Sequence, residues 1–440
     1  MHTTFPPATE EPTMTLTSTE REHDAIDLSQ PWVWDGPSAE RDALFAQLRR
    51  DRPVSWQRPI RSPMMDLLGQ ASPPGYWAIT RHEDIVTVSR TAEVFSSATG
   101  GVTFEDMPTE VLEAASSILS MDEPRHGKVR RIVSSVFTPR RINLIADQIF
   151  HQARQIVDDI AERGEVEFVE TVSARLPMWT VSEMIGIPEE QRQEVTDAAT
   201  PLTAWDDEST SATDPLTTMF TGITTLHARC QELIDARRSQ PRDDLVSALV
   251  QAEVDGVQLT DEEIRSFFVL LCVAGNDTTK QTTTHTIRAL TEFRDQREYL
   301  LADFDGRIDL AVEELIRWAS PVMTFRRTAL QSFDLNGVTI EAGDKVVLFY
   351  NSGNRDERAF ADPERFDLSR KPNPHIGFGG RGPHYCLGSH VAKLQLKAIL
   401  SELFRRLPDI EAIGEPDYLT SNFINGIKRQ QVRFTPESAR

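Results

Sequence analysis

The sequence contains few cysteines and no hydrophobic run long enough to cross a membrane. Its 440 residues include only Cys230, Cys272 and Cys386, and no two of them form a CxxC pair. Neither a zinc knuckle nor a disulfide framework is therefore indicated, and a reducing, cytoplasmic compartment is expected. The longest apolar run, residues 267–274, is far shorter than the roughly 20 residues that span a bilayer. Because the N-terminal residues also lack a signal-peptide pattern, no transmembrane segment is predicted.

Basic residues are also in the minority. The chain has 47 Lys and Arg against 68 Asp and Glu, a net charge of -21. No basic run is long enough to neutralise a phosphate backbone, so no nucleic-acid partner is expected. We interpret the acidity as a property that keeps the protein soluble. The apolar content of 39% is sufficient for a large core.

The periodicity of apolar residues predicts a mainly α-helical fold with small β-sheets. Residues 1–28 are rich in Thr, Pro and Glu and are expected to form a disordered tail, followed by a single domain over 29–440. The polar stretch 203–218 is expected to be mobile. Alternating βαβ units are not indicated. Helical patterns cover 128–163 with an interruption near Thr138-Pro139, 188–200, 222–238, 260 to the 290s, 307–319 and 387–406, and strand signals cover 76–79, 338–340 and 345–348.

Four glycines surround one cysteine in the segment FGGRGPHYCLG, residues 378–388. Glycine lets the backbone approach a flat ligand closely. A helical pattern follows Cys386 directly, and a helix N-terminus favours thiolate over thiol. A thiolate is an axial ligand of haem iron that favours O–O cleavage. The alternatives are a small buried cysteine or a phosphate-binding loop, but neither a GK[ST] nor a GxGxxG spacing is present.

This segment resembles the haem-binding loop of the cytochrome P450 superfamily, whose usual form is FGxGxHxCxG. One extra glycine separates the aromatic residue from the cysteine, as in one bacterial subgroup, and the family's Leu-Ala-Arg reads Val391-Ala392-Lys393. The resemblance implies the family's triangular, mainly helical prism. It also implies haem b (iron protoporphyrin IX) as the cofactor, with Cys386 as the metal ligand.

The segment Ala274-Gly275-Asn276-Asp277-Thr278-Thr279 lies in the middle of the long predicted helix. An acid and hydroxyls inside an apolar helix cost stability unless they have partners or a function, although a simple helix kink would also account for them. The segment matches the family's oxygen-activation signature. The resemblance implies that Asp277 and Thr278 are catalytic residues that manage proton delivery.

Glu314 and Arg317 stand at i and i+3 of a predicted helix. Taken alone, such a pair is typical of a protein surface and contributes little. The pair matches the family's Glu-x-x-Arg motif, which an arginine from a later loop completes. The segment Pro363-Glu364-Arg365-Phe366 supplies that arginine as Arg365, and the triad is expected to hold the cysteine loop in place.

The two haem propionates require cationic partners, preferably arginine. His126 and Arg130 match the family's HxxxR element, while Arg327 and His384 match two further propionate contacts, with Arg326 as a rival to Arg327. The haem-binding residues implied by the resemblance are His126, Arg130, Ala274, Gly275, Arg327, Phe378, Gly379, His384, Cys386 and Gly388.

The substrate pocket is expected to be apolar and aromatic, and Gly275 is expected to leave room in it for a chain end. Residues 318–322, 342–346, 378–380 and 423–428 resemble a subgroup that hydroxylates terminal methyl groups of methyl-branched lipids, isoprenoids and sterol side chains. The residues expected to line the pocket are Val102, Phe104, Phe268, Leu271, Val322, Met323, Phe325, Phe423 and Ile424.

No flavin or iron–sulfur region is recognisable, so electrons from NAD(P)H are expected to arrive through a ferredoxin and its reductase, with O2 as co-substrate. Arg381, Lys393 and Lys397 are expected to add positive charge to the docking face near Cys386. The alternatives are a hydroxylase of another hydrophobic secondary metabolite, a haem-based sensor or binding protein, and a peroxide-driven enzyme. The pair Asp277 and Thr278 argues against the last two.

Overall fold

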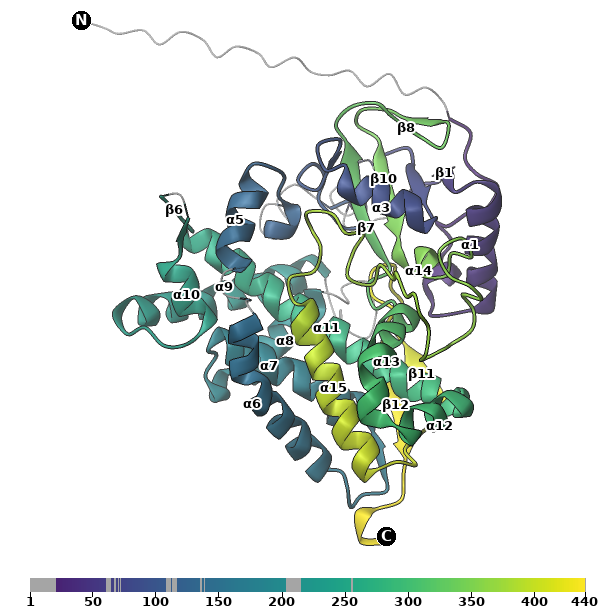
Figure 1. Ribbon diagram of the computed structural model, residues 1–440. Coiled ribbons are helices and arrows are strands. Elements are labelled where there is room, and N and C mark those ends of the chain that lie inside the picture. The colour runs from purple at the N-terminus through teal and green to yellow at the C-terminus, as the bar shows by residue number, and fades with distance from the viewer. Residues whose placement is uncertain are drawn as a thin grey trace, which may run out of the picture.

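The computed structural model is mainly helical with small sheets, as the sequence predicted (Figure 1). It describes residues 21–60, 65–66, 69, 71, 73–107, 112, 117–134, 137, 139–202, 215–254 and 256–439. Residues 1–20 of the predicted tail and 203–214 of the predicted mobile stretch lie outside this part. The tail boundary at residue 28 is wrong, because Ile26 and Leu28 are buried in the core and Arg21 forms an ion pair with Asp344 at 2.7 Å. The ordered domain therefore begins by residue 21.

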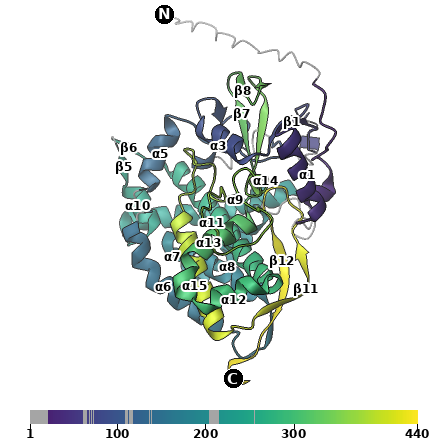
Figure 2. The same cartoon turned by 45° about the vertical axis from the view of Figure 1, so that its right-hand side comes forward.

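Most of the helices cluster on one side of the molecule, with α11 and α15 near its centre (Figures 1 and 2). Short 3-10 turns and one π-helical turn at Val169–Ser173 connect some of them. Their bounds are α1 Ala39–Asp51, α3 His82–Arg90, α5 Arg125–Ser134, α6 Pro139–Asp158, α7 Arg175–Ile185, α8 Arg192–Ala199, α9 Pro215–Ser239, α10 Leu245–Gln251, α11 Asp261–Glu292, α12 Arg294–Ala302, α13 Phe304–Ala319, α14 Tyr350–Gly353 and α15 Ser389–Arg406.

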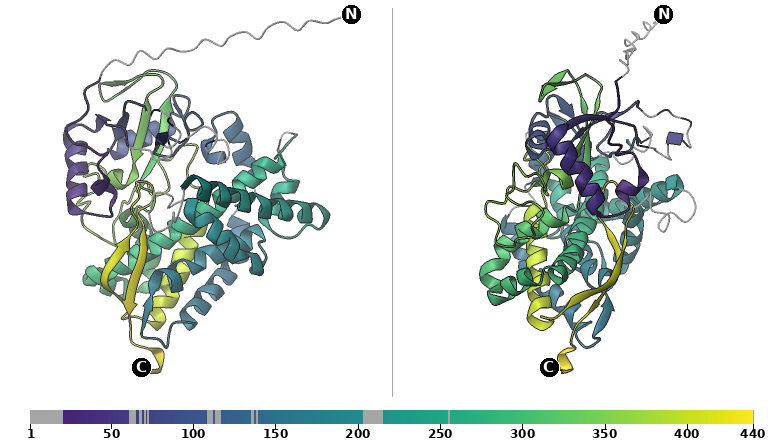
Figure 3. Two further views of the ribbon diagram at one scale, coloured as in Figure 1. Left: turned by 180° about the vertical axis from the view of Figure 1, so that it is seen from behind. Right: turned by 90° about the vertical axis from the view of Figure 1, so that its right-hand side faces the viewer.

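A five-stranded sheet lies with α1 and α3 on the other side of the molecule, in the order β1-β2-β10-β7-β3. A three-stranded sheet, ordered β11-β12-β4, runs towards the C-terminus and is clearest from behind (Figure 3). Two small hairpins pair β5 with β6 and β8 with β9. The strands are β1 Val54–Gln57, β2 Tyr76–Ile79, β3 Phe95–Ser96, β4 Glu165–Glu167, β5 Glu253–Val254, β6 Val257–Gln258, β7 Thr324–Ala329, β8 Phe333–Leu335, β9 Val338–Ile340, β10 Lys345–Phe349, β11 Glu411–Tyr418 and β12 Ile427–Arg433.

Helix α11 is the central element of the fold. Its predicted capping box is present: the Thr260 hydroxyl accepts the Glu263 N–H at 3.2 Å, and the Glu263 carboxylate accepts the Thr260 N–H at 2.9 Å. The helix packs against α7, α9, α13 and α15. Its apolar first half is buried among α7 and α9, and its second half packs in the core around α6, α13 and α15. This position brings the middle of α11 opposite the cysteine loop.

Candidate active site

The cysteine loop folds back on itself immediately before α15. The Cys386 N–H donates to the Phe378 carbonyl at 3.0 Å, and Gly388 is the N-cap of the helix. Two glycines are required by geometry: Gly379 has a φ of +103°, and a Cβ on Gly382 would lie 1.7 Å from the Ser89 carbonyl oxygen. The glycines thus let the loop pack against α3 while the Cys386 side chain lines a cavity.

The protonation of Cys386 differs from what its helix position suggested. Burial raises the pKa of the Cys386 thiol, and this effect outweighs the hydrogen bonds from the backbone of Gly388 and Ser389 and the positive charge of Arg130. The helix N-terminus alone therefore does not favour the thiolate here. A metal ion that coordinates a thiol deprotonates it outright. Formation of the Cys386 thiolate therefore depends on coordination to the iron.

All ten residues expected to contact haem line one cavity between α11 and the cysteine loop. Ala274, Gly275 and Thr278 come from α11, and Cys386 and Gly388 come from the loop. The sequence did not indicate several other lining residues, which come from α7, α10, α11 and the segments on either side of α5. These residues include Leu119, Phe137, Ile185, Leu245 and Phe267.

Basic side chains gather at one part of this cavity. Arg130, Arg327, His126 and His384 all line it, and the two histidine rings lie 4.2 Å apart between centroids. Burial lowers the pKa of His384 to about 2, and the positive charges of Arg327, His126 and Arg130 add to this effect. Within the described part of the chain, Nε2 of His126 is buried without a hydrogen-bond partner. Buried positive charge and an orphaned nitrogen fit an anionic ligand.

These features fit a haem. Its two propionates would balance the buried Arg327 and the half-buried Arg130 and give His126 a partner, while the thiol of Cys386 faces the same cavity. The apolar residues and glycines along both walls suit a flat macrocycle. Among the described residues, the cavity lining includes no Asp or Glu that would repel the propionates.

The choice between Arg326 and Arg327 follows from strand geometry, because alternate side chains of β7 point to opposite faces. Phe325 and Arg327 line the cavity, whereas Arg326 points away and forms a buried ion pair with Asp106 at 2.7 Å. Lys345 also contacts Asp106, at 3.0 Å. Arg327 is therefore the arginine that is available to a ligand in the cavity.

Of the two residues expected to deliver protons, Thr278 lines the cavity and Asp277 does not. Thr278 lines the cavity, and its hydroxyl donates to the Ala274 carbonyl at 2.9 Å. Asp277 is buried outside the cavity lining and forms an ion pair with Lys280. Two further hydroxyl residues on α11, Thr279 and Thr282, also line the cavity. Thr282 follows Thr278 by four residues and so shares its helix face, and this spacing was a signal that the sequence offered.

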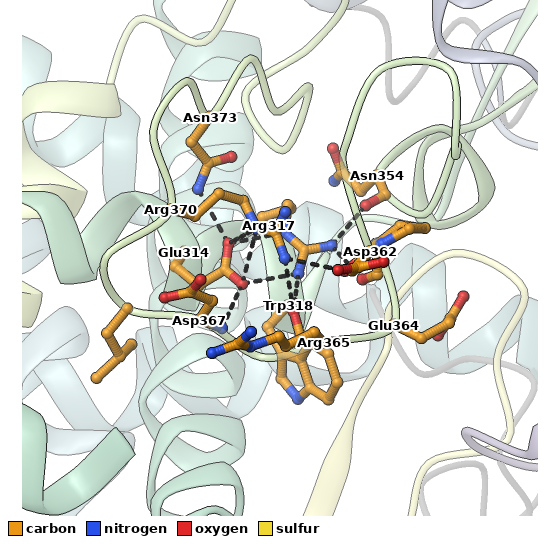
Figure 4. A network of polar contacts seen from close by, with 12 residues as sticks. Glu314, Arg317, Trp318, Asn354, Asp362, Glu364, Arg365, Asp367, Arg370 and Asn373 are labelled. Carbon is orange, nitrogen blue, oxygen red and sulfur yellow. Dashed lines mark hydrogen bonds and ion pairs between the residues drawn. The ribbon is translucent and has the colours of Figure 1, made fainter. Parts of the chain in front are cut away.

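Glu314 and Arg317 are both fully buried, and they form a two-pronged ion pair with both N···O distances at 2.7 Å (Figure 4). The prediction that Arg365 closes this triad is wrong. The Arg365 side chain is exposed, and only its carbonyl contributes, by accepting from Arg317 at 3.2 Å. Arg370 instead contacts Glu314 at 3.1 Å, and Asn373 donates to Glu314 at 3.0 Å.

Three of the nine residues expected in the substrate pocket line the cavity: Leu271, Val322 and Phe325. The other six are not among its lining residues. Phe104 and Met323 are in the core beside the sheet, and Phe268 is in the core between α9 and α11. Phe423 and Ile424 pack with Leu419 and Val322. Val102 is buried, and its carbonyl accepts the Arg326 N–H.

The sequence suggested that Gly275 leaves open space for a chain end, but in the structure Gly275 faces a neighbouring helix closely. A Cβ at this position would lie 2.5 Å from a methyl group of Val181 on α7. The glycine is therefore required for close packing of α7 against α11. Ala274 is exposed and lines the cavity, so the size of its side chain affects the room beside Thr278.

The expected docking face also differs from the prediction. Lys393 forms an ion pair with Glu313 at 2.6 Å, and Lys397 pairs with Asp309. Both lysine charges are thus compensated by acidic residues of α13, whereas Arg381 is exposed. Among the described helices, none has the length and apolar character needed to cross a membrane.

Comparisons with known proteins agree with this architecture. Residues 308–411 match the family model described as Cytochrome P450. The methyl-branched lipid omega-hydroxylase of Mycobacterium tuberculosis is 39% identical, over 93% of this chain and 95% of that protein. The steroid C26-monooxygenase of Rhodococcus jostii is 38% identical, over 90% and 82%. Among solved structures, Mycobacterium marinum cytochrome P450 CYP268A2 in complex with pseudoionone matches with a TM-score of 0.89 and 50% identity, over 95% of this chain and all of that chain.

Proposed function

The chain belongs to the cytochrome P450 family, and we propose that it hydroxylates a terminal methyl group of a methyl-branched lipid, an isoprenoid or a sterol side chain. As a member of this family it is a haem-thiolate monooxygenase that uses O2 and electrons from redox partners. The single observation that carries the proposal is that Cys386 and Thr278 face one cavity whose remaining lining is largely apolar. The lipid and sterol classes follow the names of the two relatives, and the isoprenoid class follows the sequence resemblance of residues 318–322, 342–346, 378–380 and 423–428.

We assign the cofactor as haem b, with Cys386 as the iron ligand. Arg130, Arg327, His126 and His384 would bind its propionates. When bound, the haem supplies the reductive activation of O2, in which one oxygen atom enters a C–H bond, the other leaves as water, and two electrons and two protons are consumed. The chain's own residues then hold the cofactor, place the substrate and deliver protons.

Attack at a terminal methyl is demanding because its C–H bond is stronger than that of the tertiary carbon beside it. The protein must therefore select by position, holding the chain end at the reaction site and keeping inner carbons away. Ala274, Leu271, Val322 and Phe325 line the cavity and are suited to this role. The proposal is tested by product analysis on farnesol, phytanic acid and a cholestenone. Oxidation only at inner or ring carbons, or no binding of any of the three, would overturn the regiochemistry.

Enlarging Ala274 to leucine is expected to weaken substrate binding or to move the oxidation site. The added carbons would fill part of the cavity beside Thr278, at a cost of about 1–3 kcal/mol, or roughly 10–200-fold in affinity. Titration of the Soret shift and product analysis measure both effects. Ala198→Leu on α8, outside the cavity lining, serves as the control for a change of the same size. Unchanged affinity and products in Ala274→Leu would remove Ala274 from the substrate site.

Removal of the Thr278 hydroxyl is expected to uncouple turnover. Thr278→Ala keeps the helix, because only a hydroxyl bond to the Ala274 carbonyl is lost, and it should still bind haem and substrate. Electrons should then appear as peroxide in place of product. Asp277→Asn should slow turnover, by up to about 10²–10⁴-fold if it acts in proton transfer. Simultaneous measurement of NADPH, peroxide and product decides the matter, and full coupling at an unchanged rate in both variants would contradict the role.

We further propose that a ferredoxin and its reductase deliver the electrons and that the protein is cytoplasmic. The location rests on the three cysteines, which are all free. A haem-based sensor is the alternative function. Substrate-dependent NADPH consumption with ferredoxin and reductase supports the monooxygenase, whereas binding without consumption would support the sensor.

A further inference from the structure

Glu313 bridges the two ends of the cysteine loop. It lies on α13, one residue before the buried Glu314, and its carboxylate faces the loop. One oxygen lies 2.9 Å from His375 Nε2, on the segment that leads into the loop, and the other lies 2.6 Å from Lys393 Nζ, on the helix that follows it. Cys386 is between these two contacts in the sequence. Glu313 therefore joins the entry and exit of the segment that carries the thiolate.

His375 is held at both ring nitrogens. Its side chain is only 5% exposed, Nδ1 lies 3.2 Å from the backbone nitrogen of Gly377, and Nε2 lies 2.9 Å from the Glu313 carboxylate. Burial raises the pKa of Glu313, but the hydrogen bonds from His375 and Lys393 outweigh it and lower the pKa to about 2. Glu313 and Lys393 therefore form an ion pair, and His375 holds the other oxygen of the carboxylate.

Lys393 also contacts the aromatic residue of the loop. Its Nζ lies 5.3 Å from the centroid of the Phe378 ring, and the His375 ring lies 5.9 Å from the same ring. The carbonyl of Phe378 accepts the N–H of Cys386 at 3.0 Å. Phe378 therefore links the Glu313–Lys393 ion pair to the cysteine: its ring lies beside Lys393, and its carbonyl accepts the Cys386 N–H.

Glu313 and Lys393 place opposite charges beside the aromatic residue whose carbonyl accepts the Cys386 N–H. Charges and hydrogen bonds around a thiolate ligand tune the reduction potential of its iron. A change of charge at this pair should therefore be sensed at the metal.

We propose that Glu313 and Lys393 are positioning residues that set the reduction potential of the haem by holding a balanced pair of charges against Phe378 and the cysteine loop. The inference rests on the proposed haem ligation by Cys386. Loss of Glu313 leaves the lysine cation uncompensated and makes reduction of the iron easier. Loss of Lys393 leaves the glutamate anion uncompensated and makes reduction harder.

The experiment measures the midpoint potential of the isolated, haem-loaded protein for Glu313→Gln, Lys393→Met and the double variant. Glu313→Gln should shift the potential upwards, Lys393→Met should shift it downwards, and the double variant should lie near the wild type. Lys393→Arg should restore the wild-type value, because it keeps the cation. If Glu313→Gln does not bind haem, the midpoint potentials of the two lysine variants test the proposal: Lys393→Met should lie below the wild type, and Lys393→Arg should equal it.

The chain supplies a matched control. Lys397 and Asp309 form the same type of ion pair between the same two helices, one turn away, and neither touches His375 or Phe378 in the described contacts. Lys397→Met should leave the potential unchanged. The inference is overturned if Glu313→Gln and Lys393→Met shift the potential in the same direction, or by no more than Lys397→Met. A wild-type protein that lacks the thiolate spectrum would overturn the proposed function instead.

Discussion

Replacement of Cys386 by serine is expected to abolish monooxygenase turnover and the red-shifted Soret band of the ferrous carbon monoxide complex. A serine hydroxyl has almost the size of the thiol but provides no thiolate to donate electron density to the iron. The side chain already lines the cavity, so the substitution changes the ligand and leaves the loop intact. The Phe378 carbonyl would keep its hydrogen bond, because that bond comes from the backbone of residue 386.

The control for this variant is Cys230→Ala. Cys230 is fully buried in the core between α9 and α11, and burial raises the pKa of its thiol to about 12. Its loss should lower stability without altering the spectrum. If Cys386→Ser keeps the thiolate band, or if Cys230→Ala loses it, the assignment of the iron ligand is wrong.

Arg317→Met should produce the largest loss of stability among single substitutions outside the cavity. The variant leaves the carboxylate of Glu314, which is completely buried, without its closest cation. Breaking a buried ion pair from one side typically costs about 3–5 kcal/mol. Arg317 also donates to the carbonyls of Asn354, Pro363 and Arg365, so those acceptors lose their partner as well (Figure 4). Thermal and denaturant unfolding of the haem-loaded proteins measure the difference.

Arg365→Met is the matched control, because its guanidinium is exposed and only its backbone joins the network. A surface substitution of this kind should change the free energy of unfolding by no more than about 0.5 kcal/mol. A similar loss in Arg365→Met and Arg317→Met would contradict the network described here. Arg370→Met should resemble Arg317→Met, since Arg370 contacts Glu314 directly.

Short sequence patterns predicted those structural features that depend on residues close together in the sequence. The capping box at Thr260 and Glu263 marked the start of α11 correctly. The glycines around Cys386 were expected to let the backbone approach a flat ligand, and in the structure Gly382 packs against the carbonyl of Ser89 on α3. The family resemblance then located the cavity, since all ten residues it implied for the haem line the same space. The capping box and the glycine pattern each lie within a few residues of the feature that they concern.

The failures have a different physical origin. Arg365 and Arg370 are five residues apart, and the path of the loop between them decides which guanidinium is buried. Phe104 and Met323 were expected in the pocket because they are large and apolar, but the same property suits the core in which they pack. Leu245 lines the cavity only because α10 packs beside α11, and that placement depends on the whole fold.

The central claim is that the protein inserts one oxygen atom of O2 into a terminal methyl group of a hydrophobic chain. The most direct test supplies ¹⁸O2 to the protein with ferredoxin, reductase and NADPH, and analyses the product of a branched or isoprenoid substrate by mass spectrometry with fragmentation. The account predicts one heavy oxygen atom per hydroxylated product, located at the terminal carbon, and no heavy oxygen when only the water is labelled. Oxygen derived from water, or a heavy atom found only at inner carbons, would contradict it.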